Sequence, residues 1–147
     1  MLHADSAVHA LSLLAVLNSM TFDWILRRLA AGLHLNRFYL EAMPLPRVSE
    51  PDAGELAAFA AARMLAGRCR GLAGRELVQL KGVAAGSPPS AGRVEAIVAA
   101  GYGLEAEDLS RVMDTGAEDR KGLWRFFAAN PEALETAVEG IELLAAR

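Results

Sequence analysis

The residue types that most often carry chemistry are scattered along this chain. Its three histidines are His3, His9 and His34, and no two of them have the i, i+4 spacing of a helical metal-binding pair. The single cysteine, Cys69, lies between two arginines that favour its thiolate form, but no histidine stands out as its partner. We therefore predict no metal site and no catalytic residue in this chain.

Short motifs that hold nucleotides or build a nucleophile are also missing from the sequence. It contains no Gly-x-Gly-x-x-Gly, no phosphate-binding loop and no Gly-x-Ser-x-Gly. Carboxylate pairs occur at Glu105 with Asp108 and at Glu118 with Asp119, where the first turn of a helix favours acidic side chains. We interpret these pairs as stabilising helix starts and not as a general acid and base.

The segment Ser-Pro-Pro-Ser at 87–90 is similar to the polar-Pro-Pro-aromatic loop of amino-methylating DNA enzymes. In that loop an aromatic ring stacks on the flipped base, and Ser90 supplies no ring. We interpret the segment as a linker. It also marks a change in charge: residues 1–81 carry nine basic and seven acidic side chains, and residues 82–147 carry six and eleven, so the halves are +2 and −5.

The composition predicts a mainly α protein. Of its 147 residues 53% are hydrophobic but only 6% aromatic, and the apolar runs consist of Ala and Leu. The net charge of −3 excludes a protein that holds nucleic acid by bulk charge alone. No run of about 18 apolar residues and no basic signal region occurs, so we expect no membrane contact and a cytoplasmic location.

The elements expected from these patterns form a helical bundle of about six to seven helices. Apolar spacing predicts a helix over 5–17, a second one capped by Ser19 or Thr21, and a third opened by Ser49 and Pro51. Two prolines predict a short extended segment near 43–48. Three or four further helices follow the linker, so we divide the chain into segments 1–86 and 87–147.

One block of the first segment resembles a known family. It consists of Leu-Leu-Ala-Val-Leu-Asn-Ser at 13–19, Phe-Asp-Trp at 22–24, Arg-Arg at 27–28, His-Leu-Asn-x-Phe-Tyr-Leu at 34–40 and Met-Pro-Leu-Pro at 43–46. This order is similar to a block in type IIG (Eco57I-like) and phage-defence adenine-specific DNA methyltransferases. There it follows the catalytic domain, in or beside the target-recognition region.

A second block is similar to the tail of the same enzymes. It comprises Arg-Val-Glu-Ala-Ile-Val at 93–98, Tyr-Gly-Leu at 102–104, Glu-Asp-Leu at 107–109 and Asp-Arg-Lys-Gly-Leu-Trp-Arg at 119–125. The resemblance implies the C-terminal, target-recognition-associated portion of an adenine methyltransferase of a restriction–modification or phage-defence system. The catalytic domain that binds S-adenosylmethionine has no counterpart here, so methyl transfer and this cofactor belong to the parent enzyme.

The resemblance implies duplex DNA as a partner. Among the residues from Arg27 to Arg37, Asn36 is suited to an adenine edge and Arg37 to a guanine, although Asn36 is better explained as a helix cap. A second and more basic stretch is formed by Arg68, Arg70, Arg75 and Lys81. It is a candidate for phosphate contact, although solvated charges explain it about as well. The predicted DNA-binding residues are Arg27, Arg28, His34, Asn36, Arg37, Arg68, Arg70, Arg75 and Lys81.

A second hypothesis is a helical interaction module that docks on a separate methyltransferase catalytic domain and does not touch DNA. The acidic segment 87–147 favours this hypothesis, because acidic side chains repel phosphate. Apolar surface left exposed by a missing catalytic domain would also favour a homodimer of the isolated chain.

Overall fold

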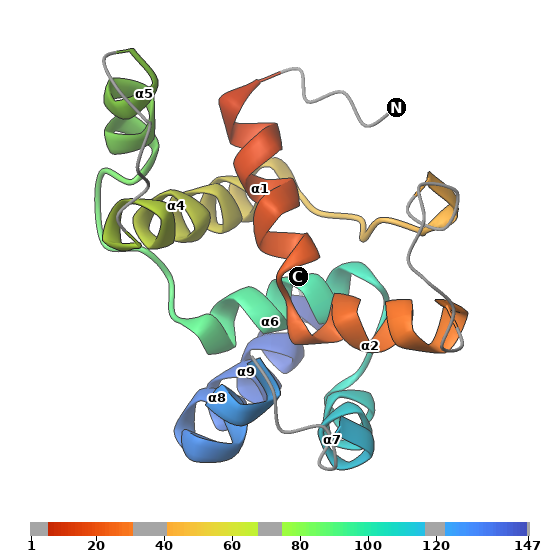
Figure 1. Cartoon of the computed structure of the whole chain (residues 1–147). Helices are drawn as coiled ribbons and strands as arrows, with labels where there is room; N and C mark the ends of the chain where they lie inside the picture. Colours follow the sequence, from red (N-terminus) through yellow and green to blue (C-terminus); the bar gives the residue numbers. More distant parts are fainter. Residues whose placement is uncertain (1–5, 31–40, 68–74, 117–122, 147) are drawn as a thin grey trace.

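The chain folds into helices that cross one another around a common interior (Figure 1). The computed structural model describes residues 6–30, 41–67, 75–116 and 123–146. The helices of these residues are α1 (Ala7–Leu17), α2 (Met20–Ala30), α4 (Glu50–Ala66), α5 (Arg75–Val83), α6 (Ala91–Gly101), α7 (Ala106–Gly116), α8 (Leu123–Ala129) and α9 (Pro131–Ala145). The predicted mainly α class is confirmed, and none of the described residues forms a strand.

Serine side chains begin three of the helices. The hydroxyl oxygens of Ser6, Ser49 and Ser90 each accept a hydrogen bond from a backbone N–H three residues later, at 3.2, 3.3 and 3.1 Å. Such caps satisfy donors that the first helical turn leaves without a partner. Prolines also lie in the first turns of α4 and α9, where a missing N–H costs nothing.

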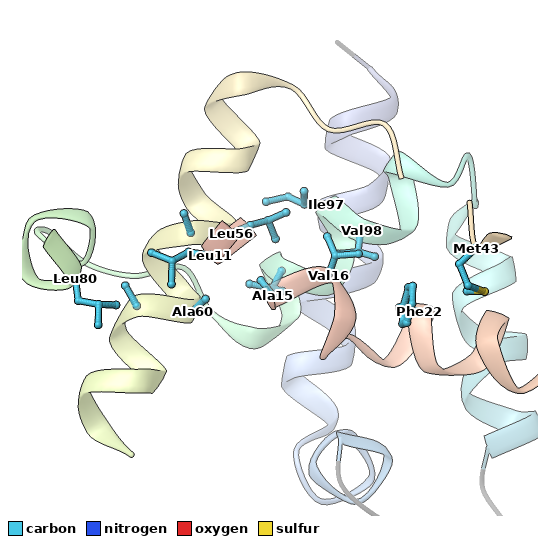
Figure 2. Packing of buried hydrophobic residues seen from close by; sticks show 13 residues of the cluster. Leu11, Ala15, Val16, Phe22, Met43, Leu56, Ala60, Leu80, Ile97 and Val98 are labelled. Carbon is cyan, nitrogen blue, oxygen red and sulfur yellow. The ribbon is translucent and has the colours of Figure 1, made fainter. Parts of the chain in front are cut away.

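The interior consists of two groups of buried apolar side chains. The first group joins α1 and α4 to α2, α5 and α6. Figure 2 shows Leu11, Leu56 and Ile97 within it. The second group lies between α6, α7, α8 and α9 and includes Met20, the first residue of α2. Both groups therefore draw on residues before and after the 87–90 linker, while the division into two segments stays a prediction.

Helices α6 and α9 pack closely because small residues line their crossing. A Cβ added at Gly92 of α6 would overlap the carbonyl oxygen of Ala133, and one at Gly140 of α9 would lie 2.7 Å from the Cβ of Ala96. Glycine at these two positions lets the backbones approach each other. The crossing therefore holds α6 and α9 close together.

The predicted extended segment near 43–48 is confirmed as the non-helical residues 44–49. The segment runs to the C-terminal end of α6, where Arg47 N–H donates to the Gly101 carbonyl at 2.8 Å. The Tyr102 hydroxyl donates to the Pro44 carbonyl at 2.9 Å. These two bonds hold the proline-rich segment against the end of α6.

Other features of the fold differ in how well the sequence predicts them. Helix α5 has no counterpart among the expected helices, because the glycine-rich stretch before it conceals its start. Four helices follow the linker in the described residues, as expected, and residues 117–122 before α8 lie outside the described ranges. No single helix of the described residues is long and apolar enough to cross a membrane, although α1 with α2, bent by 66°, passes that test as a pair.

Candidate functional site

The most unusual polar group in the described structure is a carboxylate in the interior. Glu95 of α6 is 2% exposed and lies between the buried side chains of Val94 and Ala96. Its Oε1 accepts a hydrogen bond from the backbone N–H of Met20 at 2.6 Å. Its Oε2 accepts from both the N–H and the hydroxyl of Thr21, each at 3.1 Å.

These bonds place the carboxylate at the N-terminus of α2. The Ser19 hydroxyl accepts from the Phe22 N–H at 3.1 Å, so Ser19 is the capping residue that the sequence offered as one of two choices. Thr21, the other choice, donates to Glu95 instead. Together Ser19 and Glu95 satisfy the first three N–H groups of α2, and the negative charge lies at the positive end of the helix dipole.

Burial also changes the acidity of this group. Removal from water raises the pKa of Glu95 to about 7, while the hydrogen bonds from Met20 and Thr21 oppose that rise. A carboxyl with a pKa near neutrality is suited to proton transfer when it faces a substrate. Here both oxygens contact the start of α2, so the arrangement joins two helices.

A second polar cluster joins α4 to α6. Arg93 donates through Nε and Nη2 to the two carboxylate oxygens of Glu55, both at 2.9 Å, and through Nη2 to Asp52 at 3.2 Å. The Ser49 hydroxyl donates to the other oxygen of Asp52 at 2.5 Å. The hydrogen bond to Glu55, followed by the nearby negative charges, raises the pKa of Arg93, so the guanidinium stays charged. This cluster is a crosslink between helix starts.

The carboxylates proposed as helix starts behave as expected where the structure describes them. The Asp108 side chain accepts from the Glu105 N–H at 3.0 Å, which caps α7, and Arg111 lies 3.5 Å from the same carboxylate. Glu118 and Asp119 lie outside the described residues. Within the described ranges no three His, Cys, Asp or Glu side chains come together as a metal ion would require.

The predicted DNA-binding residues that the structure describes fall on two helices. On α2, Arg27 Nε donates to Asp23 at 2.8 Å, and the Arg28 guanidinium lies 4.3 Å from the centre of the Trp24 ring. On α5, both Arg75 and Lys81 are exposed. The remaining predicted residues lie outside the described ranges: His34, Asn36, Arg37, Arg68 and Arg70, together with Cys69.

The two described basic groups do not form one surface. Figure 1 shows α5 at one end of the molecule, next to α4, and α2 on another side. The sequence places all nine residues in one segment, and it gives no indication of this separation in space.

Sequence reasoning assigned no role to Glu95. The signal that identifies it is one acidic side chain inside the apolar run Val-Glu-Ala-Ile-Val at 94–98. A charge at the centre of a buried helix face needs a partner, because an unpaired buried charge costs several kcal/mol.

Comparison of the whole chain with protein-family models, with curated proteins and with solved structures finds no match. The function is therefore argued from the residues and their arrangement.

Proposed function

We propose that this chain is a non-catalytic, target-recognition-associated portion of an adenine-specific DNA methyltransferase, and that it helps to position duplex DNA. Such enzymes act in restriction–modification and phage-defence systems in the cytoplasm. The observation that carries the proposal is that the two methyltransferase-like blocks, far apart in the sequence, lie against each other in the fold, where Tyr102 of one bonds to Pro44 of the other.

Two contacts join these blocks. Glu95 of the second block accepts hydrogen bonds from Met20 and Thr21, which lie within the first block between Ser19 and Phe22. Tyr102 of the second block donates to Pro44 of the first. The bond between Tyr102 and Pro44 joins motif residues of the two blocks that are 58 positions apart, and this contact supports treating the two resemblances together.

The C-terminal half of α2 supplies the described cations for DNA in this proposal. Arg27 and its partner Asp23 have side chains 51% and 36% exposed, so their ion pair is weak and a phosphate can compete for the guanidinium. Arg28 stacks one face on Trp24, which leaves its N–H donors at the edge of the plane. Asn36 and Arg37, further along the chain, are the residues proposed to read an adenine and a guanine.

The proposal gives this chain no chemical step. S-adenosylmethionine and the transferred methyl group belong to the catalytic part of the enzyme, and the role of this chain is to hold DNA. Phosphate contacts from arginine set the position of a duplex, and base-edge contacts select its sequence.

Salt dependence of DNA binding tests the proposal. Fluorescence anisotropy of a labelled random-sequence duplex is measured from 50 to 300 mM KCl for the wild type, Arg27→Ala/Arg28→Ala and the control Arg111→Ala, an exposed arginine of α7. Each lost phosphate contact lowers the slope of log K against log salt by about 0.9. We expect a loss of about two units for the α2 variant and none for the control. An unchanged slope for the α2 variant would contradict the proposed role of α2.

The alternative is a protein-docking module that leaves DNA to its partner. The separation of α2 from α5 favours it, because the helices that carry the described cations lie on different sides of the molecule (Figure 1). A neighbouring reading frame with a polar-Pro-Pro-aromatic loop would supply the partner. Co-purification of that partner with this chain, without any DNA binding by the chain alone, would favour the alternative.

A further inference from the structure

Two helices carry the two most exposed large apolar side chains among the described residues. Val78 of α5 is 70% exposed and Leu143 of α9 is 68% exposed. A single exposed apolar side chain is ordinary on a protein surface. The charges around these two residues are what distinguish them, because they have opposite signs.

The outer face of α5 is basic. Arg75, Val78 and Lys81 follow at three-residue steps and are all exposed, whereas Leu80 is buried on the side that packs on α4. Glu76, the acidic residue of α5, lies about 100° round the helix from Arg75, on the side away from Val78. Neither Arg75 nor Lys81 forms an ion pair with any described residue.

The outer face of α9 is acidic. It carries four exposed glutamates at steps of three, four and three residues, which place them along one side of the helix: Glu132, Glu135, Glu139 and Glu142. Leu143 borders this row. The sequence of α9 contains no basic residue, and its opposite side is buried against α6 through Gly140 and Ile141.

These faces do not meet within one chain. Helix α5 packs on α4, and α9 packs on α6, α7 and α8. In Figure 1 α5 projects at one end of the molecule, away from the group formed by α8 and α9. A complementary contact therefore needs a second molecule.

We propose that α9 of one copy of this chain docks on α5 of a second copy, with Leu143 against Val78 and the glutamate row facing one of the two cations that flank Val78, Arg75 or Lys81. Along a helix each residue advances about 1.5 Å, so Arg75 and Lys81 each lie about 4.5 Å from Val78 along the helix axis, one before it and one after it. Glu139 lies about 6 Å from Leu143 on the same measure. When the two apolar side chains meet, a carboxylate and a cation come within reach of each other.

A closed dimer can make this contact twice. Each copy carries both faces, so a two-fold arrangement pairs α5 with α9 at two equivalent places. This proposal is independent of the proposed function, because it requires neither DNA nor a methyltransferase partner.

Charge reversal tests the contact. Sedimentation velocity at 5 to 500 μM is measured for the wild type, for Arg75→Glu/Lys81→Glu and for Glu139→Lys/Glu142→Lys. We expect the wild type to form a dimer, and each variant to weaken it by about tenfold or more because like charges then face each other. An equimolar mixture of the two variants restores opposite charges at both contacts, so it should associate about as well as the wild type.

Two further variants serve as controls. Arg125→Glu of α8 and Glu107→Lys of α7 reverse exposed charges elsewhere and should leave the dimer unchanged. Far-ultraviolet circular dichroism checks that every variant is folded. A wild type that stays monomeric to 500 μM, or a dimer that no α5 or α9 variant alters, would overturn the proposal. If the wild type is monomeric and Arg75→Glu/Lys81→Glu no longer binds duplex DNA, the proposal is also overturned. The basic face of α5 is then assigned to nucleic acid.

Discussion

The side chain of Glu95 in α6 accepts a hydrogen bond at 2.6 Å from the backbone N–H of Met20, 75 positions earlier in the chain. This bond joins the start of α2 to the interior of α6. It also places the one buried carboxylate of the α6 core at the end of a helix dipole, where a negative charge is favoured.

The first prediction concerns pH. Because burial raises the pKa of Glu95 from 4.5 to about 7, the folded protein holds a proton that the unfolded chain has released over that range. The contribution of Glu95 to the free energy of unfolding is therefore fully present below pH 4.5 and falls by about 3 kcal/mol as the pH rises to 7. Urea unfolding of wild type minus Glu95→Gln should show this fall between pH 5 and 7. A pH-independent difference would contradict the assignment.

The second prediction concerns the contact itself. Glu95→Ala leaves the Met20 and Thr21 N–H groups buried without an acceptor, so we expect about 3 kcal/mol of destabilisation. Glu105→Ala serves as a control, because Glu105 is exposed and only its backbone takes part in the cap of α7. Chemical denaturation of both variants measures the difference. Equal stability of the two variants would show that the buried carboxylate does not join the helices.

The third prediction concerns the crossing of α6 and α9. Gly92→Ala brings a methyl group against the carbonyl oxygen of Ala133, which is backbone and cannot rotate away. We expect about 2 kcal/mol or more of destabilisation. Gly54→Ala, in α4 with open space around its Cβ, should instead stabilise the protein by about 0.5–1 kcal/mol. Thermal unfolding compares them, and a harmless Gly92→Ala would mean that the helices lie further apart.

The fourth prediction concerns the cluster of Arg93. Arg93→Ala removes the ion pair with Asp52, whose side chain is 13% exposed, so we expect about 1–2 kcal/mol of destabilisation. Arg93→Lys keeps the charge but cannot bind both oxygens of Glu55, and should recover part of the loss. The measurement is urea unfolding at pH 7. Complete recovery by lysine would show that charge alone is needed.

The fifth prediction concerns the proline-rich segment. Burial raises the pKa of Tyr102 to about 12, so its hydroxyl remains a donor to the Pro44 carbonyl at every pH below that value. Tyr102→Phe removes this donor and should cost about 1 kcal/mol. Amide hydrogen exchange at Arg47, which bonds to Gly101 beside it, should quicken in the variant. Unchanged exchange at Arg47 would show that its bond to Gly101 forms independently of the bond between Tyr102 and Pro44.

The sequence predicts the helices that begin with strong local signals. Serine caps, first-turn prolines and 3.6-residue spacing act within a few residues, so α4 starts at Ser49 and Pro51, where the sequence indicates. The glycine-rich stretch before α5 gives no such local signal. The outward position of Val78 depends on how α5 packs against α4, and no local pattern contains that packing.

The site is predicted less completely than the fold. The two motif blocks are visible in the sequence, but the bond between Glu95 and Met20 depends on how α6 meets α2. Similarly, Arg27 and Arg75 are both arginines of the predicted segment 1–86, and only the tertiary fold places them apart. Contacts between distant residues are decided by packing, and a single sequence does not contain their geometry.

Hydrogen exchange with and without DNA shows whether α2 contacts the duplex. The wild-type chain is incubated with a 30-base-pair random duplex at 50 mM KCl, and exchange is followed in peptides from α2 and α9. We expect DNA to slow exchange in the C-terminal half of α2, around Arg27 and Arg28, and to leave exchange in the acidic helix α9 unchanged. No protection in α2 at saturating DNA, or protection in α9 instead, would contradict this expectation.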